Sequence, residues 1–468
     1  MNPPDSIPGK AQLVVIGAGP GGYAAAFRAA ELGLAVTLVD PEVNPGGVCL
    51  YRGCIPSKAL LHLARMVGEA EEAAALGVSF GKPQIDLERV RQWKKGVVDR
   101  LTGGLGARAK QLKLTYLRGK ARFKDATTLA ITTAEGEEGE LAFEQAILAT
   151  GSRPIPLPGT DPDGGRILDS TAALELAEIP KSLLVIGGGY IGLELGSVYA
   201  ALGSQVSLVE MTDGLLPGCD RDLVSVLRRR LDKRFSEILL STRVTKLRPQ
   251  KNRVEVSLED GKGEKSTRRF DQVLVAIGRR PNTEGLGLEN TTVRLDAKGF
   301  VEVDGQRRSA ERHIFAIGDI AGEPMLAHKA YAEAHVAAEA AAGHKALFEP
   351  RAIPAVVFTD PEIAWCGLTE TAARAQKLEI KTAKLPWRGN GRCLTLGREE
   401  GLTKLIVDAA SQRLLGVAMA GPGAGELIAE GVLALEMAAV AEDLRHTIHP
   451  HPTLSETLYD AAQMLFKG

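Results

Sequence analysis

The sequence QLVVIGAGPGG occupies residues 12–22 and decides the fold of the N-terminal part of the chain. Its apolar run, residues 12–16, predicts a buried β-strand, and the alanine-rich residues 23–32 predict a helix. Residues 35–39 predict a second strand, which is followed by Asp40. The stretch therefore predicts a β-α-β unit whose first turn carries three spaced glycines, Gly17, Gly19 and Gly22.

This glycine-rich turn predicts a dinucleotide site. A turn without side chains lets a pyrophosphate approach the helix N-terminus, whose unpaired N–H groups favour an anion. Asp40 stands 23 residues beyond Gly17, where its carboxylate can accept hydrogen bonds from a ribose. A strand-turn-helix without a ligand is the alternative, but the acid at the end of the second strand favours the dinucleotide site.

A second copy of the pattern begins at residue 182 with the sequence SLLVIGGGYIGLE. Its next strand, residues 205–210, ends in Glu210, again 23 residues beyond the first glycine. A carboxylate there suits the free 2′-hydroxyl of NAD and would repel the 2′-phosphate of NADP, and residues 211–217 contain no arginine to bind that phosphate. The second site is therefore predicted to bind NAD through Gly187, Gly189 and Gly192.

Two cysteines follow the first dinucleotide unit, in the sequence GVCLYRGCIPSK of residues 47–58. Cys49 and Cys54 precede an apolar helical run, so both sulfurs are predicted on one turn at a helix start, where a disulfide can close. A helix N-terminus lowers the pKa of a thiol, so a sulfur released by reduction would be a reactive thiolate. Two core cysteines are the alternative. Beside two dinucleotide sites, the pair instead predicts electron transfer among thiol, flavin and nicotinamide.

Further turns carry small or acidic residues after a predicted strand. The dinucleotide segments are predicted to end on the closing strands 145–150 and 272–277, and small residues accompany their ends: Thr150, Gly151 and Gly278. Residues 313–317 predict a strand with Asp319 just beyond it, where a polar cofactor chain could lie. Ala327 then opens a predicted long helix, whose N-terminal N–H groups could stabilise negative charge on a reduced isoalloxazine ring.

The composition changes at residue 351, after which apolar strands alternate with helices and no nucleotide motif recurs. Strands are predicted at residues 355–358 and 402–407, and helices at residues 424–437 and 455–465. The C-terminal third is therefore predicted to be a separate domain.

This domain ends in the sequence TIHPHPTLSE, residues 447–456. Its two prolines hold His449 and His451 in a rigid turn. Glu456, predicted one turn into the following helix, can accept a hydrogen bond from an imidazole, an arrangement typical of a general base. Exposed histidines in a surface turn are the alternative, which the cysteine pair upstream disfavours.

Composition excludes several functions. Among 468 residues, 57 Lys and Arg nearly balance 58 Asp and Glu, so no charge excess indicates binding to nucleic acid or to a membrane surface. Five cysteines in so long a chain indicate a reducing compartment, and three of them are isolated, Cys219, Cys366 and Cys393. The first eight residues show no targeting pattern and no apolar stretch approaches a membrane span. We expect a cytoplasmic protein without a metal site.

In their order along the chain, these motifs resemble the flavin disulfide reductase family over nearly the whole sequence. The matching stretches are residues 17–22, 46–60, 187–194, 318–319 and 451–456, and the last is the most specific to members that oxidise dihydrolipoamide. The resemblance implies an α/β fold with two Rossmann-like domains, for FAD and NAD, and a C-terminal α+β dimerisation domain.

The implied domain boundaries are four. Residues 1–154 would form the first part of the FAD-binding domain, residues 155–282 the NAD-binding domain, residues 283–350 the return segment of the FAD-binding and central domain, and residues 351–468 the interface domain.

Carried over residue by residue, the resemblance makes Cys49 the sulfur that exchanges with a dihydrolipoyl group and Cys54 the sulfur against the flavin. His451, oriented by Glu456, would be the acid/base, and Asp319 would hold the ribityl chain of the flavin. Lys58 and Glu194 would form an ion pair near the reactive flavin nitrogen. Further cofactor contacts are expected from Gly47, Lys58, Thr150, Gly151, Ala327 and Gly278.

The implied reaction oxidises dihydrolipoyl groups of 2-oxoacid dehydrogenase or glycine-cleavage complexes and passes a hydride to NAD. The implied partners are a second copy of the chain, whose His451 would reach this copy's disulfide, and a lipoyl-bearing acyltransferase subunit or glycine-cleavage lipoyl protein. A cis bond between His451 and Pro452 is also implied. The sequence departs from the family pattern at Val48, Tyr51 and Arg52, which bear on redox potential and rate. It also departs at Asp40, which shortens the ribose contact without removing it, and at Pro450, which stiffens the turn.

Two alternatives stay open. The first is another reductase of the family, although glutathione reductase would require arginines in place of Glu210, and mercuric or large thioredoxin reductases would require a redox pair at the C-terminus, where this chain reads MLFKG. The second is a flavoprotein with mainly a scaffold role in a multienzyme complex.

Overall fold

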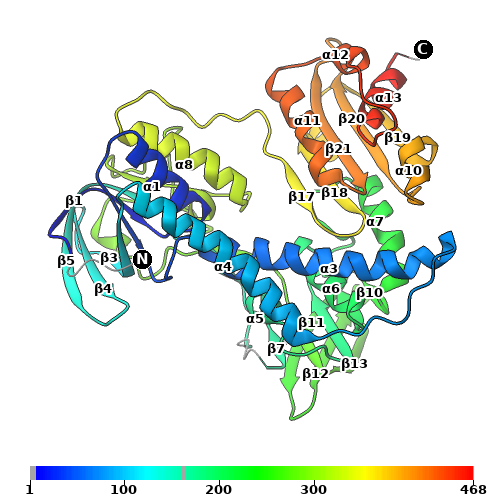
Figure 1. Cartoon of the computed structure of the whole chain (residues 1–468), viewed down its shortest axis with the longest axis horizontal. Helices are drawn as coiled ribbons and strands as arrows, with labels where there is room; N and C mark the ends of the chain where they lie inside the picture. The colour runs from blue at the N-terminus through cyan, green and yellow to red at the C-terminus, as the bar shows by residue number, and fades with distance from the viewer. Residues whose placement is uncertain (1–6, 161–164, 467–468) are drawn as a thin grey trace. The chain divides into compact units, whose positions relative to one another are not determined.

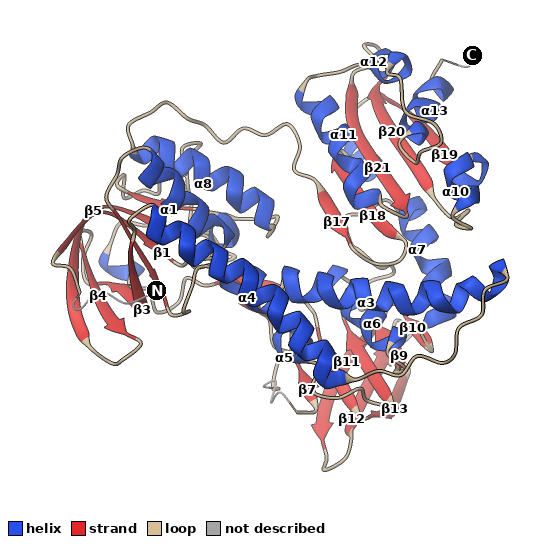
Figure 2. Cartoon of the chain, in the orientation of Figure 1, coloured by secondary structure: helices blue, strands red, loops and turns tan. Residues whose placement is uncertain are grey.

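The computed structural model describes residues 7–160 and 165–466. It contains two compact units: one takes the chain up to Ala59 with residues 88–155 and 278–349, and the other takes residues 60–87, 156–277 and 350 onward. Figures 1 and 2 label the elements of both. Within the described residues, none of the helices has the length and apolar character that crossing a membrane requires.

A six-stranded sheet forms the first unit, in the order β1-β2-β3-β4-β5-β16, and β1 also pairs with β5. Strand β1 runs parallel to β2 and β5, and β16 runs parallel to β5, as the predicted β-α-β unit requires. Strand β4 runs antiparallel to β3 and β5. Their bounds are Lys10–Ile16, Val36–Asp40, Thr115–Phe123, Thr128–Thr133, Glu138–Leu148 and Ile314–Ala316. The strands predicted at residues 12–16, 35–39 and 313–317 are therefore confirmed within about two residues. The strand predicted at residues 145–150 is the end of the longer strand β5, which begins at Glu138.

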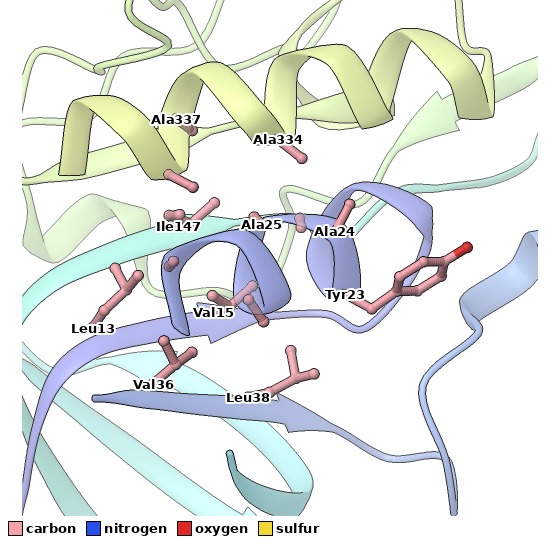
Figure 3. Packing of buried hydrophobic residues seen from close by; sticks show 14 of the residues in the cluster. Leu13, Val15, Tyr23, Ala24, Ala25, Val36, Leu38, Ile147, Ala334 and Ala337 are labelled. Carbon is pink, nitrogen blue, oxygen red and sulfur yellow. The ribbon is translucent and has the colours of Figure 1, made fainter. Parts of the chain in front are cut away.

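Helices of the first unit pack on this sheet through alanine. Helix α1 (Pro20–Glu31) lies against α8 (Ala327–Ala341), because small side chains let the two helices approach closely. Figure 3 shows Ala334 and Ala337 on the side of α8 that faces α1, above the β1 and β2 side chains. The remaining elements are α2 (Gly47–Arg52), α4 (Leu87–Gln111), β6 (Ser152–Pro154), β15 (Arg279–Pro281) and the short turns η2 (Leu288–Asn290) and η3 (Gly318–Ala321).

The second unit contains the second dinucleotide pattern. Its parallel sheet has the order β10-β9-β8-β14-β7, with bounds Glu237–Leu239, Gln205–Val209, Ser182–Ile186, Gln272–Val275 and Ile167–Leu168. Its helices are α5 (Ser170–Glu175), α6 (Tyr190–Ala201) and α7 (Arg221–Arg234). An antiparallel sheet of β11 (Thr242–Pro249), β12 (Val254–Asp260) and β13 (Lys265–Phe270), side by side in Figure 2, was not predicted.

The same unit includes an antiparallel sheet in the order β17-β18-β21-β20-β19, covered by α11. The strands are Ala355–Val357, Glu362–Gly367, Leu414–Gly421, Leu402–Asp408 and Ile380–Pro386. The helices are α9 (Glu370–Ala375), α10 (Gly391–Thr395), α11 (Ala424–Glu436), α12 (Ala441–His446) and α13 (Glu456–Met464), with η4 (Trp387–Gly389) between β19 and α10. The four elements predicted after residue 351 are confirmed. Helix α3 (Cys54–Glu72) and η1 (Ala73–Leu76) complete the chain.

Candidate active site

The two glycine motifs repeat one geometry. Gly17 has φ +97°, and a Cβ there would lie 2.4 Å from the carbonyl oxygen of Ala149, at the end of the closing strand β5. Gly187 has φ +111°, and its Cβ would lie 2.3 Å from the carbonyl oxygen of Ala276, just after β14. The backbone at the end of each predicted closing strand therefore lies so close to the first glycine of its motif that only glycine fits there. The third glycines, Gly22 and Gly192, have no room for a Cβ either.

The middle glycine of each motif faces open space instead. A Cβ at Gly189 would meet no atom within 4 Å, and one at Gly19 would meet only Gly47, at 3.9 Å. Both glycines are N-caps, of α6 and α1, and neither forms a side-chain capping bond. Two helix N-termini thus carry N–H groups with bare backbone in front of them, the arrangement that accepts a pyrophosphate. These residues fit the adenine dinucleotides FAD and NAD.

The two acids predicted to contact ribose brace these turns. Asp40 Oδ2 accepts the N–H of Ala18 at 2.7 Å, and Glu210 Oε2 accepts the N–H of Gly188 at 2.7 Å, so each carboxylate holds the second residue of its motif. Burial raises the pKa of Asp40 to about 6, although the Ala18 N–H and the charge of Arg52 act in the opposite direction. The sequence predicted the place of each acid but not this backbone contact.

The cysteine pair lies on two helices rather than on one turn of a single helix, which corrects the prediction. Cys49 is in the middle of the short α2, and Cys54 is the first residue of α3. Both are thiols here and hydrogen-bond to each other. That hydrogen bond, burial and the charge of Cys54 raise the pKa of Cys49, whereas the backbone N–H of Cys54, at the start of α3, and the charge of Lys58 lower it. For Cys49 in this dithiol form, the expected lowering by a helix N-terminus is present but outweighed, so the net shift of its pKa is upward.

Two tyrosines near the pair were missed by the sequence analysis. The hydroxyls of Tyr23 on α1 and Tyr331 on α8 hydrogen-bond to each other, and the rings meet edge to face with centroids 5.6 Å apart. Burial raises the pKa of both hydroxyls, and the charges of Cys49 and Cys54 add to that rise. Because 308 residues separate the two tyrosines, no local pattern could have paired them.

Asp319 is held from a strand far away in sequence. Its Oδ2 accepts the hydroxyl of Ser152 at 2.6 Å, and Arg279 Nε donates to the same hydroxyl at 2.8 Å. Ser152 is in β6 and Arg279 in β15, which pair with each other directly after Gly151 and Gly278. The glycines that follow the two closing strands thus lead into the residues that fix Asp319.

Three other predicted cofactor residues lie at the ends of elements: Thr150 just after β5, Ala327 at the start of α8 and Gly47 at the start of α2. Thr150 and Asn282 exchange two hydrogen bonds of 2.9 Å, from the Thr150 hydroxyl to the Asn282 carbonyl and from the Asn282 amide to the Thr150 carbonyl. Ala327 is the first residue of α8, whose N-cap Leu326 forms no side-chain capping bond. Gly47, with φ +58°, packs its Cα against Gly19.

Lys58 and Glu194 belong to different units, and their ion pair stays a prediction. Lys58 lies on α3 in the first unit. Glu194 lies on α6 in the second unit, with 3% of its surface exposed, and accepts the N–H of Phe358 at 3.0 Å.

His451 and Glu456 are brought together as predicted. His451 Nδ1 lies 2.8 Å from Glu456 Oε1, and Glu456 Oε2 accepts the N–H of Thr453 at 2.7 Å. The Thr453 N–H, followed by His451, lowers the pKa of Glu456. The imidazole is 77% exposed, and the bond from His451 to Pro452 is cis, as the resemblance implied. Glu456 is the first residue of α13, not one turn into it.

His449 has a different environment from His451, which the sequence did not reveal. Its side chain is 6% exposed, and Nε2 lies 2.7 Å from Glu430 Oε1 on α11, while Nδ1 lies 3.1 Å from the Thr447 carbonyl oxygen. Both partners are hydrogen-bond acceptors, one beside each ring nitrogen, so the ring is held from two sides. His449 therefore anchors the turn from which His451 projects.

Among the residues that the structure describes, one acidic cluster has the spacing of a metal site, formed by Asp220, Asp222 and Glu370. The ammonium of Lys404, on β20 and fully buried, lies 2.7 to 2.9 Å from an oxygen of each. The lysine charge thus takes the place that a cation would need, and the cluster joins α7 to β20 and α9.

Two family models match the chain. The model described as pyridine nucleotide-disulphide oxidoreductase matches residues 11–334, and that of the dimerisation domain of the same family matches residues 353–462. The chain is 48% identical to a dihydrolipoyl dehydrogenase of Haemophilus influenzae over 459 residues, which cover 98% of this chain and 95% of the relative. It is also 48% identical to one of Thermus scotoductus, over 97% of each chain.

Solved structures show the same fold. LpdA from Mycobacterium tuberculosis aligns with a TM-score of 0.89 at 28% identity, over 97% of this chain and 99% of LpdA. The HOCl-induced flavoprotein disulfide reductase RclA from Escherichia coli, as a Cu(II) complex, aligns with a TM-score of 0.86 at 28% identity, over 97% of this chain and 99% of RclA.

Proposed function

Because this chain belongs to the pyridine nucleotide-disulphide oxidoreductase family and uses its cofactors, FAD and NAD, we propose that it oxidises dihydrolipoyl groups to lipoyl groups. The observation that carries this substrate is the exposed imidazole of His451, oriented by Glu456, in a chain that also holds the thiol pair Cys49 and Cys54. A dithiol substrate needs a base to form its thiolate, and a disulfide to receive that thiolate.

His451 begins the proposed reaction. With Nδ1 directed at Glu456, the ring presents its other nitrogen, which takes a proton from one dihydrolipoyl thiol. The resulting thiolate attacks Cys49 of the oxidised pair, and the Cys49–Cys54 bond breaks, so Cys54 leaves as a thiolate. The second substrate thiol then displaces Cys49 as a thiol and closes the lipoyl disulfide. Two electrons and two protons have passed to the protein.

Cys54 suits the role of the sulfur that carries the charge. It is exposed and begins α3, whose N-terminal N–H groups favour an anion. The redox chemistry between the dithiol and NAD would be supplied by FAD when it is bound. Within the first unit, Asp40, Asp319 and the glycines around Gly19 would hold FAD, and within the second, Glu210 and the glycines around Gly189 would hold NAD.

The domain and partner assignments are part of this proposal. Residues 1–154 and 283–350 would serve FAD, residues 155–282 NAD, and residues 351–468 an interface between two copies. The matched dimerisation domain includes both His451 and Glu456, which supports a homodimer in which that histidine acts on the partner's disulfide. The dithiol chemistry further supports a lipoyl-bearing acyltransferase or glycine-cleavage lipoyl protein as the substrate carrier, in the cytoplasm.

An anaerobic stopped-flow experiment tests the proposal. The holoenzyme is mixed with dihydrolipoamide, the flavin spectrum is followed, and NAD or NADP is then added. We expect fast formation of the long-wavelength charge-transfer band of a thiolate beside flavin, discharged faster by NAD than by NADP. A flavin that NADH reduces but dihydrolipoamide does not would refute the substrate and indicate another disulfide. Cys49→Ser should keep the band, and its loss would reverse the assignment of the two sulfurs.

A further inference from the structure

Two buried charges of opposite sign lie on α8, outside the residues that the proposed reaction uses. Lys329 and Glu333 are one helical turn apart, with side chains 5% and 0% exposed, and Lys329 Nζ lies 3.0 Å from Glu333 Oε1. Burying charge is costly unless each group is paired and hydrogen-bonded. The contacts of the pair therefore indicate what the buried charges hold in place.

Both side chains hydrogen-bond to the backbone of the turn η3. Glu333 Oε2 accepts the N–H of Gly318 at 2.6 Å. Lys329 Nζ donates to the carbonyl oxygen of Gly322 at 3.0 Å and to that of Gly318 at 3.3 Å. The N–H and the carbonyl of Gly318 are thus both bound by α8, and the far end of the turn is bound as well.

Arg307 adds a third charge and ties the preceding strand to the same carboxylate. Its Nη1 lies 3.0 Å from Glu333 Oε1, and its guanidinium carbon lies 4.9 Å from the centre of the Phe348 ring. Its carbonyl oxygen accepts the N–H of Ala316, the last residue of β16. Glu333 consequently links the backbone on both sides of the strand end, through Arg307 before the turn and through Gly318 within it.

The peptide bond held by these contacts is the one between Gly318 and Asp319. The carbonyl of Gly318 belongs to the peptide bond to Asp319, so fixing this carbonyl fixes where the Asp319 backbone begins. Gly318 itself has φ +74°, and a Cβ there would lie 3.2 Å from the side chain of Ala330 on α8, a tight contact. The Asp319 carboxylate is held independently by Ser152.

We propose that Lys329 and Glu333 are positioning residues that hold Asp319 in the place from which it binds the ribityl chain of FAD. This inference rests on the proposed role of Asp319. We call the contacts of Lys329 and Glu333 with turn η3 the clamp. Since α8 supplies both the clamp and the helix N-terminus predicted to face the flavin ring, one rigid element sets two contacts to the same cofactor.

The test measures how fast FAD leaves the holoenzyme, from the rise of flavin fluorescence after dilution, for Glu333→Gln, Asp319→Asn and the double variant. Glutamine keeps the shape but removes the anion shared by Lys329 and Arg307. We expect each single variant to release FAD about tenfold faster, as loss of a charged hydrogen bond predicts. We expect the double variant to be within about twofold of the faster single variant, because Glu333 acts through Asp319.

The outcomes separate the two hypotheses. If Asp319→Asn releases FAD at the wild-type rate, the role of Asp319 is wrong and the inference falls with it. If Asp319→Asn is faster but Glu333→Gln is not, or if the two effects multiply, the role of Asp319 stands and the clamp is refuted. Multiplying effects would mean that Glu333 supports the fold in general.

Two further variants complete the test, one as a matched control and one as a replacement if Glu333→Gln does not fold. Glu339→Gln is the matched control on the same helix, because Glu339 pairs with Arg28 and His344, away from the turn, and should leave FAD release unchanged. Should Glu333→Gln fail to fold, Lys329→Met removes the donors to the two glycine carbonyls while Glu333 keeps Arg307. FAD release from folded Lys329→Met at the wild-type rate would overturn the clamp.

Discussion

Replacing Glu456 tests whether its carboxylate fixes the tautomer in which His451 can act as a base. The two oxygens of the carboxylate have different partners, the His451 ring and the backbone N–H of Thr453. In Glu456→Gln, the amide oxygen has to accept the Thr453 N–H, because the backbone donor cannot turn away. The amide NH₂ then points at Nδ1 and donates to it, so the hydrogen of the ring moves to the other nitrogen, which can no longer take a proton.

The structure sets the size of the effect. Glu456→Ala leaves the imidazole in water, free to adopt either tautomer, and removes one charged hydrogen bond of a ring that is 77% exposed. At that exposure the bond contributes about 1 kcal/mol, so reduction by dihydrolipoamide should slow about fivefold. Glu456→Gln blocks the base itself and should slow the same step about 100-fold or more. The glutamine variant, although closer in shape, is therefore expected to be the worse enzyme.

Anaerobic stopped-flow reduction of the flavin by dihydrolipoamide measures both variants. Reduction by NADH is the internal control and should be unchanged, because it does not use His451. His451→Gln sets the lower limit of the rate. Equal rates for the alanine and glutamine variants, or a faster glutamine variant, would refute the tautomer argument and leave Glu456 with no more than a packing role.

Three other changes have definite expected results. Burial alone would raise the pKa values of the three carboxylates around Lys404, whereas hydrogen bonds from Lys404, and from Lys384 to Asp222 and Glu370, lower them. This pairing therefore stabilises the fold above about pH 4 and is lost in acid. Lys404→Met should cost about 3–5 kcal/mol in urea unfolding at pH 7 and less near pH 4; a loss independent of pH would contradict this. Glu210→Ala should raise KM for NAD about tenfold with kcat nearly unchanged, and an unchanged KM would exclude Glu210 from the site. His449→Gln should slow reduction by dihydrolipoamide about tenfold and spare reduction by NADH; slowing of both would indicate general unfolding, not loss of the Glu430 anchor.

The sequence was sufficient for features that lie within one short segment. Each dinucleotide unit was predicted because its strand, its glycines, its helix and its acid follow one another within about 30 residues, and each glycine position has its own steric reason. The pairing of His451 with Glu456 was predicted for the same reason, since five residues and one helix start bring them together. Local geometry decides these contacts, so the order of residues reveals them.

Contacts between distant segments needed the tertiary structure. Ser152 reaches Asp319 across 167 residues, and Tyr23 reaches Tyr331 across 308. Lys404 would read as an exposed strand lysine, yet it is fully buried because α7 and α9 supply carboxylates from elsewhere in the chain. His449 and His451 are alike in sequence, but one is buried and the other exposed, because Glu430 on a separate helix binds only the first. Residue types and spacing determined which chemistry this chain could perform. The packing of distant elements decided which charged side chains are buried, paired or exposed to solvent, because burial and electrostatic partners depend on the whole fold.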